Sequence, residues 1–183
     1  MSLAMPRLLQ PPKSAGPRIY LAGKISKNCW RQKLVPNIRG ASWPDAPLNC
    51  GDWCYTGPFF VSCDHSCGHA SSWHGASPNG CGAGEGITRD QVFDANIQAI
   101  KRSDALVAYL TSYDCIGSIF EITFAQDRGI PTFLLFAPNV DALEFWVPSI
   151  RAKRMRGLPR VASEADLPRA LDAIVRDLRR GRA

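Results

Sequence analysis

The central part of the chain alternates apolar runs with polar loops, a pattern typical of a parallel sheet covered by helices. Residues 105–110 form an apolar run of strand length, and residues 132–136 form a second one. Between them, residues 117–128 carry apolar side chains at helical spacing, and Gly129-Ile130-Pro131 ends that helix. A strand, a helix and a strand within about thirty residues predict a βαβ unit, which requires a parallel sheet with helices on its faces.

Further elements are predicted before this unit. Residues 18–23 read as a strand that runs into a glycine turn, and residues 27–35 as a short helix capped by Ser26 and ended by Pro36. A longer helix is predicted from Thr88 to about residue 103, with Gln91 completing a capping box. Its expected buried stripe consists of Val92, Phe93, Ile97 and Ile100.

Shorter elements and a terminal helix are predicted after residue 138. Residues 142–146 favour a short helix or loop, and residues 158–161 a short edge strand. Residues 166–179 predict an amphipathic helix with an inward stripe of Leu167, Leu171, Ile174 and Leu178. The fold class expected from these elements is α/β, with a mostly parallel sheet.

The domain organisation follows from the length and from two irregular stretches. A chain of 183 residues corresponds to one domain with a sizeable core. Residues 1–17 read as a disordered tail, and residues 40–86 as an insertion rich in Gly, Pro, Cys, His and Trp, with one extended run at 58–62. We therefore expect a single domain over residues 18–183 that carries this insertion.

Charge and hydropathy narrow the class of partner. No apolar stretch approaches the roughly twenty residues that cross a bilayer, and the N-terminal stretch is too short in apolar residues for an export signal, so a cytoplasmic protein is expected. The net charge of +6 is concentrated at residues 151–160 and 176–182. Because such basic segments are usually solvated faces, nucleic-acid binding is not the favoured interpretation.

Glu121 is the candidate for chemistry in the βαβ unit. Ligands of parallel α/β sheets bind beyond the carboxyl ends of the strands, where residues 113–121 are predicted to lie. Tyr20, near the end of the first strand, could point into the same crevice. Gly117 and Ser118 open the helix with free backbone N–H groups that suit a sugar hydroxyl or a phosphate. The simplest alternative makes Glu121 a surface residue and Tyr20 a core aromatic.

Three ordered motifs resemble the nucleoside 2-deoxyribosyltransferase family: YLAG at 20–23, AIKRSDALVAYL at 99–110 and GSIFEITFAQDRGIP at 117–131. The resemblance implies a flavodoxin-like, Rossmann-type three-layer sandwich that cleaves or exchanges the N-glycosidic bond of a nucleoside or nucleotide. It implies that Glu121 is the nucleophile and that Tyr20 holds its carboxylate. It also implies a homo-oligomer whose pocket a neighbouring subunit closes, with the terminal helix or the insertion at the interface.

Two positions depart from the family pattern. The Asp expected two residues before Gly117 is Cys115 here, with Asp114 displaced by one. The sugar-contacting Asp of the family falls on Asn96, with Asp94 two residues away. We therefore take Asp114 as a third catalytic candidate. The substrate-binding candidates are Gly23, Asp94, Asn96, Gly117, Ser118, Phe59, His65 and His69.

A carboxylate beside the anomeric carbon suits glycosidic cleavage on chemical grounds alone. Cleavage of an N-glycosidic bond passes through an oxocarbenium-like state, which a carboxylate beside the anomeric carbon stabilises and can capture as an ester. The leaving nucleobase needs a proton donor, for which Asp114, Asp94 or a histidine could serve. The chemistry requires no cofactor.

The insertion concentrates groups that could line a pocket or hold a metal. It contains five of the seven cysteines and all three histidines of the chain. A zinc site formed by Cys50, Cys54, Cys63 and Cys67 is the alternative to a pocket wall that includes His65 and His69. Disulfides are disfavoured because no export signal is visible. Aromatic residues of the insertion, among them Phe59, could stack a nucleobase.

Two classes of function remain open from the sequence. One is an enzyme that acts on nucleosides or nucleoside monophosphates by transfer to another base or to water. The other is a non-catalytic nucleotide-binding or zinc-stabilised interaction module on the same fold. An enzyme requires the carboxylate of Glu121, whereas a binding module tolerates glutamine there.

Overall fold

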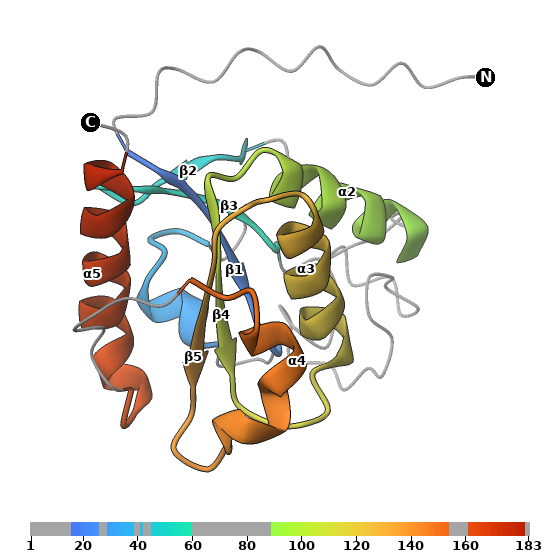
Figure 1. The fold of residues 1–183 in the computed structure, drawn as a ribbon. Helices are drawn as coiled ribbons and strands as arrows, with labels where there is room; N and C mark the ends of the chain where they lie inside the picture. Colours follow the sequence, from blue (N-terminus) through green and yellow to red (C-terminus); the bar gives the residue numbers. More distant parts are fainter. Residues whose placement is uncertain are drawn as a thin grey trace, which may run out of the picture.

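The computed structural model describes residues 16–25, 29–38, 41, 45–59, 89–153 and 161–181 (Figure 1). In these ranges the chain forms one five-stranded sheet with the order β2-β3-β1-β4-β5. The strands are β1 (Arg18–Ala22), β2 (Leu48–Asn49), β3 (Cys54–Gly57), β4 (Ala105–Leu110) and β5 (Thr132–Phe136). All neighbouring pairs are parallel except β2 with β3. The α/β class and the mostly parallel sheet are thus confirmed, and the arrangement is compatible with a Rossmann- or flavodoxin-like fold.

Helices lie on both sides of the sheet. Four α-helices occur in the described ranges: α2 (Arg89–Lys101), α3 (Ile116–Asp127), α4 (Trp146–Ser149) and α5 (Leu167–Arg180). Three short 3-10 helices accompany them: η1 (Trp30–Lys33), η3 (Ala142–Phe145) and η4 (Glu164–Asp166). Figure 1 shows α2 and α3 on one side of the sheet and α5 on the other. No helix of the described ranges is long and apolar enough to span a membrane.

The core lies between these layers. Every residue of β4 is buried, because helices cover both faces of the strand. The predicted inward stripe of α5 is confirmed, since Leu167, Leu171, Ile174 and Leu178 are all buried. The start of β1 is fixed to the start of β4 by Asp104, whose carboxylate accepts a hydrogen bond from Arg18 N at 2.7 Å.

The strand order creates a topological switch point beside β1, where the connections from neighbouring strands leave toward opposite edges of the sheet. The chain passes from β1 to β3 on one side of β1 and then crosses to β4 on the other side. The connections that leave β1 and β4 therefore diverge at the carboxyl ends of these two strands. Ligands of open α/β sheets bind at such a divergence.

Two predictions for residues 40–86 are corrected. The stretch is not irregular throughout. Cys54–Gly57 forms β3, which pairs in parallel with β1 next to the centre of the sheet. β3 is short and contains Cys, Thr and Gly, so its apolar signal is weak, although all four residues are buried. The extended run expected at 58–62 is not a strand at Pro58 and Phe59; residues 60–62 lie outside the described ranges.

Other predicted elements differ in detail. The helix expected at 27–35 is the 3-10 helix η1, in which Arg31 is fully buried. Phe93 of α2 is half exposed rather than buried. Val161 is not in a strand. The caps expected at Ser26 and Thr88 lie outside the described residues, as do residues 1–15 and 158–160.

Candidate functional site

Glu121 lies on the face of α3 that packs against the sheet. The buried residues of α3 are Ser118, Ile122 and Ala125, which follow one another at helical spacing. Glu121 is three residues after Ser118 and therefore falls within this stripe. α3 contacts β1, β4 and β5, so a half-buried carboxylate is directed at the centre of a parallel sheet. The interpretation of Glu121 as a surface residue is excluded.

Tyr20 holds this carboxylate. Tyr20 is fully buried in β1, and its Oη donates a hydrogen bond of 2.6 Å to Oε1 of Glu121. The ring lies close to Gly57 of β3, where an added Cβ would stand 3.1 Å from Cε2 of Tyr20. The absence of a side chain at position 57 thus leaves room for the ring. Tyr20 and Glu121 are brought together as the resemblance implied.

Burial controls the ionisation of the pair. Removal from water raises the pKa of Glu121 to about 7, while the hydrogen bond from Tyr20 and the positive charge of Arg31 act in the opposite direction. The pKa of Tyr20 is raised well above its usual value, chiefly by burial and also by the neighbouring carboxylate. The phenol therefore remains a donor at neutral pH. Glu121 titrates in the physiological range, as carboxyl groups of active sites often do.

Arg31 is a buried cation at the end of β1 that sequence reasoning missed. Its Nε donates to the carbonyl oxygen of Leu21 at 2.7 Å, and its Nη2 donates to that of Gly23 at 2.8 Å. Nη1 donates to the carbonyl oxygen of Lys24 at 3.4 Å, and the guanidinium lies 4.6 Å from the centre of the Trp30 ring. One side chain thus fixes the loop after β1 and places a positive charge near Glu121.

Gly23 allows this loop to turn. Its φ is +142°, and an added Cβ would lie 2.6 Å from the carbonyl oxygen of Tyr109 in β4. Only glycine adopts this backbone without strain and with this close approach. Gly23 therefore has a structural role in the loop at the switch point.

Asp114 joins the two loops at the switch point. Its carboxylate forms an ion pair with Lys24 at 2.7 Å, which links the loop after β1 to the loop after β4. The hydrogen bond from Lys24 lowers the pKa of Asp114. At neutral pH this exposed carboxyl is ionised, so it can protonate a leaving base only after taking up a proton itself. Its position fits a tether between the loops.

The other candidates occupy different environments. Asn96 is half-buried on α2, and its Oδ1 is buried with no hydrogen-bond partner among the described residues, which leaves an acceptor available there. Asp94 is exposed on the same helix. Gly117 is exposed in the first turn of α3, and Ser118 is buried one turn before Glu121.

Phe59 and the cysteines of β2 and β3 pack inside the protein. The ring of Phe59 is buried edge-on against Tyr55 at 5.5 Å, so it contributes to the core and does not offer a free stacking face. Cys50 is half-buried and Cys54 is buried, and neither forms a disulfide within the described part of the chain. Burial raises the pKa of Cys50 to about 11, which disfavours the thiolate that binds zinc.

The zinc hypothesis is not decided by these two residues. His65, His69, Cys63 and Cys67 lie outside the described ranges. Within the part of the chain that the structure describes, no group of three or more His, Cys, Asp or Glu residues is placed to hold a metal. The pocket wall and the zinc site therefore both stay predictions.

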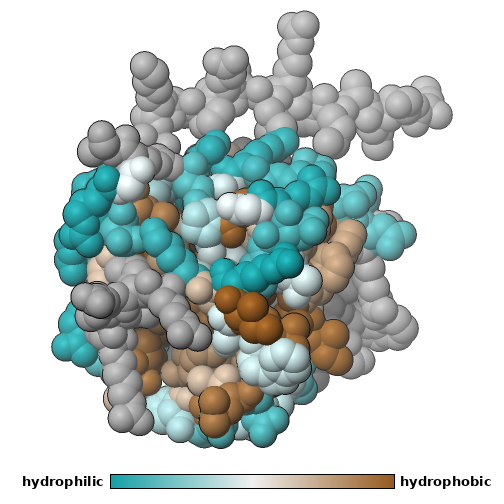
Figure 2. All heavy atoms as spheres, in the orientation of Figure 1, coloured by the Kyte–Doolittle hydropathy of each residue, from teal (hydrophilic) through white to brown (hydrophobic). Residues whose placement is uncertain are grey.

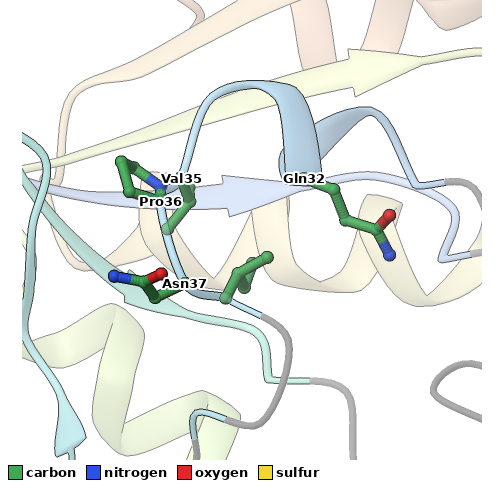
Figure 3. A pocket seen from close by; sticks show the side chains of 5 residues that line it. Gln32, Val35, Pro36 and Asn37 are labelled. Atoms are coloured by element: carbon green, nitrogen blue, oxygen red, sulfur yellow. The ribbon is translucent and has the colours of Figure 1, made fainter.

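A hollow of about 440 Å³ lies beside η1 (Figure 3). It is lined by Gln32, Val35, Pro36, Asn37 and Ile38. None of these side chains ionises, so the hollow supplies no acid, base or nucleophile. It is a separate feature from the Tyr20–Glu121 pair.

Comparison with known proteins finds no matching family model, no matching curated protein and no matching solved structure. The functional assignment therefore rests on the sequence motifs and on the geometry of the Tyr20–Glu121 pair.

Glu121→Gln is expected to stabilise the fold at alkaline pH. The folded state raises the pKa of Glu121 from 4.5 to about 7, so folded protein binds this proton more tightly than unfolded protein. Wild-type stability accordingly falls as pH rises from 4.5 to 7, by at most about 3 kcal/mol. Urea unfolding should show the variant to be more stable at pH 8 and the advantage to vanish near pH 4. The control is Asp172→Asn, at an exposed carboxylate of α5. An equal pH dependence of stability in both variants would contradict a stability effect that is specific to the burial of Glu121.

Arg31→Met is expected to destabilise the protein by about 2–4 kcal/mol, because it leaves buried carbonyl oxygens of the loop after β1 without donors. Arg176→Met, at an exposed position of α5, is the matched control and should change the free energy of unfolding by less than about 0.5 kcal/mol. Chemical denaturation at pH 7 measures both. A similar small effect for the two variants would mean that the Arg31 hydrogen bonds do not support the loop.

Proposed function

We propose that the protein cleaves or exchanges the N-glycosidic bond of a nucleoside or nucleoside monophosphate, with Glu121 as the nucleophile. The observation that carries the proposal is the 2.6 Å hydrogen bond from Tyr20 to a half-buried carboxyl of pKa about 7, beside a switch point of a parallel sheet. The arrangement matches what the resemblance to nucleoside 2-deoxyribosyltransferases implies for these two residues. With it we propose the finer fold, a flavodoxin-like three-layer sandwich.

The proposed reaction has two steps. In the first, a carboxylate oxygen of Glu121 bonds to the anomeric carbon while the carbon–nitrogen bond breaks, and the base leaves with the electron pair and takes up a proton. In the second, water or another base attacks the anomeric carbon, the bond from that carbon to the Glu121 oxygen breaks to release the carboxylate, and the proton of the attacking group passes to the residue that protonated the first base. Two inversions retain the configuration of the sugar. Transfer and hydrolysis differ only in the second acceptor.

Tyr20 and Arg31 affect the ionisation state of the Glu121 carboxyl. Partial burial strengthens the interaction between a carboxylate and a developing oxocarbenium ion, but it also favours the protonated, unreactive acid. The hydrogen bond and the nearby guanidinium shift the balance back toward the carboxylate. Tyr20 also occupies one oxygen, Oε1, which leaves Oε2 for the sugar.

The substrate contacts in this proposal come from α2 and α3. The unpartnered Oδ1 of Asn96 is an acceptor for a sugar hydroxyl, and the first turn of α3, with Gly117 and Ser118, offers backbone donors. His65 and His69 are the proposed proton donors for the leaving base, because imidazoles titrate near neutrality.

Loss of the carboxylate should abolish glycosidic cleavage. Glu121→Gln preserves the size and a hydrogen-bonding oxygen, so the fold remains while turnover falls at least several hundred-fold. The assay incubates the protein with nucleosides and monophosphates, with and without a second free base, and separates the products by chromatography. Asp172→Asn, at an exposed position of α5 on the opposite side of the sheet from α3, should keep wild-type turnover. Cleavage by Glu121→Gln at the wild-type rate would refute the mechanism, and substrate binding without cleavage by either protein would indicate a binding module.

Tyr20→Phe should move the acidic limb of the pH–rate profile upward. Wild-type activity is expected to rise through pH 7 as Glu121 ionises. Removal of the phenol hydroxyl removes a hydrogen bond that lowers the pKa of this carboxyl, so the limb shifts to higher pH and activity at pH 6 falls more than activity at pH 9. A loss of activity that is equal at every pH would show that Tyr20 does not act through the ionisation of Glu121.

A further inference from the structure

The segment after β5 exposes large apolar side chains in a row. Four of them are more than half exposed: Leu143 (77%), Trp146 (64%), Val147 (56%) and Ile150 (66%). Their spacing of three, one and three residues places them on one side of the turns formed by η3 and α4, with Ile150 at the C-cap in helical conformation. Phe145 is buried in the core and holds this segment to the protein. We call the four exposed residues the α4 ridge.

The ridge is larger than the scattered apolar exposure of an ordinary surface. A large apolar residue has on the order of 200 Å² of surface, so four that are about two-thirds exposed present on the order of 500 Å². Figure 2 shows hydrophobic surface over the region where Figure 1 places α4. Apolar patches of this size on a protein surface are often interaction sites.

Apolar exposure is confined to one side of the sheet among the described residues. α4 contacts α3, which lies on the side away from α5. The other large apolar side chains that are about half exposed or more lie on α2, on α3 or in the loop before α3: Phe93, Tyr113, Ile116 and Phe120. The outward face of α5 carries exposed charged residues instead: Arg169, Asp172, Arg176, Arg179 and Arg180. The protein therefore has an apolar side, which includes the ridge, and a charged side.

Positive charge follows the ridge directly. Arg151 is next to Ile150 and is exposed. From residue 151 to residue 160 the sequence contains five cations and no acid. Lys153 is paired with Asp177 at 2.7 Å, and residues 154–160 lie outside the described ranges and contribute to the argument only by their charge. Glu144 is the one acid between positions 142 and 160. The apolar row is thus joined to a segment of net positive charge.

An anionic lipid surface matches both features. Its hydrocarbon boundary accepts aliphatic side chains, and its headgroups carry the negative charge that attracts Arg and Lys. Tryptophan is enriched at this boundary, because its ring is apolar and its N–H meets polar groups. A nucleic acid would match the cations but not the aliphatic residues of the ridge. A protein partner would need a groove complementary to the ridge, whereas a bilayer conforms to it.

We propose that the protein binds the surface of an anionic lipid bilayer, with the α4 ridge at the boundary of headgroups and hydrocarbon and Arg151 among the headgroups. A short apolar row and a few cations are each weak anchors, so the binding requires both and is reversible. The proposal does not depend on the reaction of Glu121. It places the lipid surface next to the loop after β4, because Tyr113 of that loop stacks on Phe145 at 5.8 Å.

Co-sedimentation of the full chain with vesicles tests the proposed surface. Two compositions are compared: phosphatidylcholine alone and an equimolar mixture of phosphatidylcholine and phosphatidylserine. We expect the wild type to pellet with the mixed vesicles at low ionic strength and to bind phosphatidylcholine alone at least about ten-fold more weakly. Added salt should weaken the binding, because it screens the attraction between the cations and the headgroups. Protein centrifuged without vesicles gives the background.

Variants of the ridge and of its charges identify the contact. Trp146→Ala and Leu143→Ser should each weaken binding to the mixed vesicles about ten-fold, since each removes apolar area from the contact. Arg151→Gln should weaken it about five-fold, and Glu144→Gln should strengthen it by a similar factor. Arg176→Gln makes the same change of charge on α5, far from the ridge, and should leave binding within about two-fold of wild type. Circular dichroism confirms that the variants are folded.

Three outcomes would overturn the proposal. In the first, the wild type does not pellet with the mixed vesicles, or it pellets equally with both compositions. In the second, folded Trp146→Ala and Leu143→Ser bind as the wild type does, because the attraction would then come from net charge alone. In the third, Arg151→Gln and Arg176→Gln lose the same binding, because charge beside the ridge would then have no special part in it.

Discussion

The placement of an ionisable carboxyl on the sheet-facing stripe of α3 is the constraint on which the site depends. Helical spacing from Ser118 to Ile122 places Glu121 on this stripe, where its side chain is half-buried. A buried carboxyl needs a donor, and Tyr20 of β1 supplies it. The Tyr20 hydroxyl reaches the carboxyl of Glu121 for two reasons. β1 pairs with β4, the strand that precedes α3, and Gly57 leaves room for the Tyr20 ring. The hydrogen bond thus depends on the strand order, on the register of β1 and β4, and on glycine at position 57.

The parts of the fold that the sequence predicts well are those with continuous apolar runs. β4 and β5 have the predicted bounds because central parallel strands are buried on both faces and read as uninterrupted apolar segments. α5 is equally clear, since its leucines and isoleucine recur at helical spacing between exposed arginines. Glu121 could be placed at the carboxyl edge of the sheet because it follows β4, and Tyr20 because it lies near the end of the strand predicted at 18–23.

The remaining features depend on tertiary contacts that no local pattern encodes. β3 has too few apolar residues to be recognised before its neighbour β1 is in place. Arg31 reads as a solvated residue of a short helix, and only the carbonyl groups at the end of β1 explain its burial. Phe93 fits an inward stripe by spacing, yet it packs on Phe120 at the edge of α2 and α3 and stays half exposed.

The two members of the central pair are 101 residues apart in the chain, and this separation links chemistry to the completion of folding. Contacts between distant segments close late, since they carry the largest loss of chain entropy. In a chain whose β1 has not yet joined β4, Glu121 is an ordinary solvated carboxylate with a pKa of 4.5 and no phenol beside it. A chain in which β1 has not joined β4 therefore holds no perturbed carboxyl, and the titration of this single group reports whether β1 and α3 have come together.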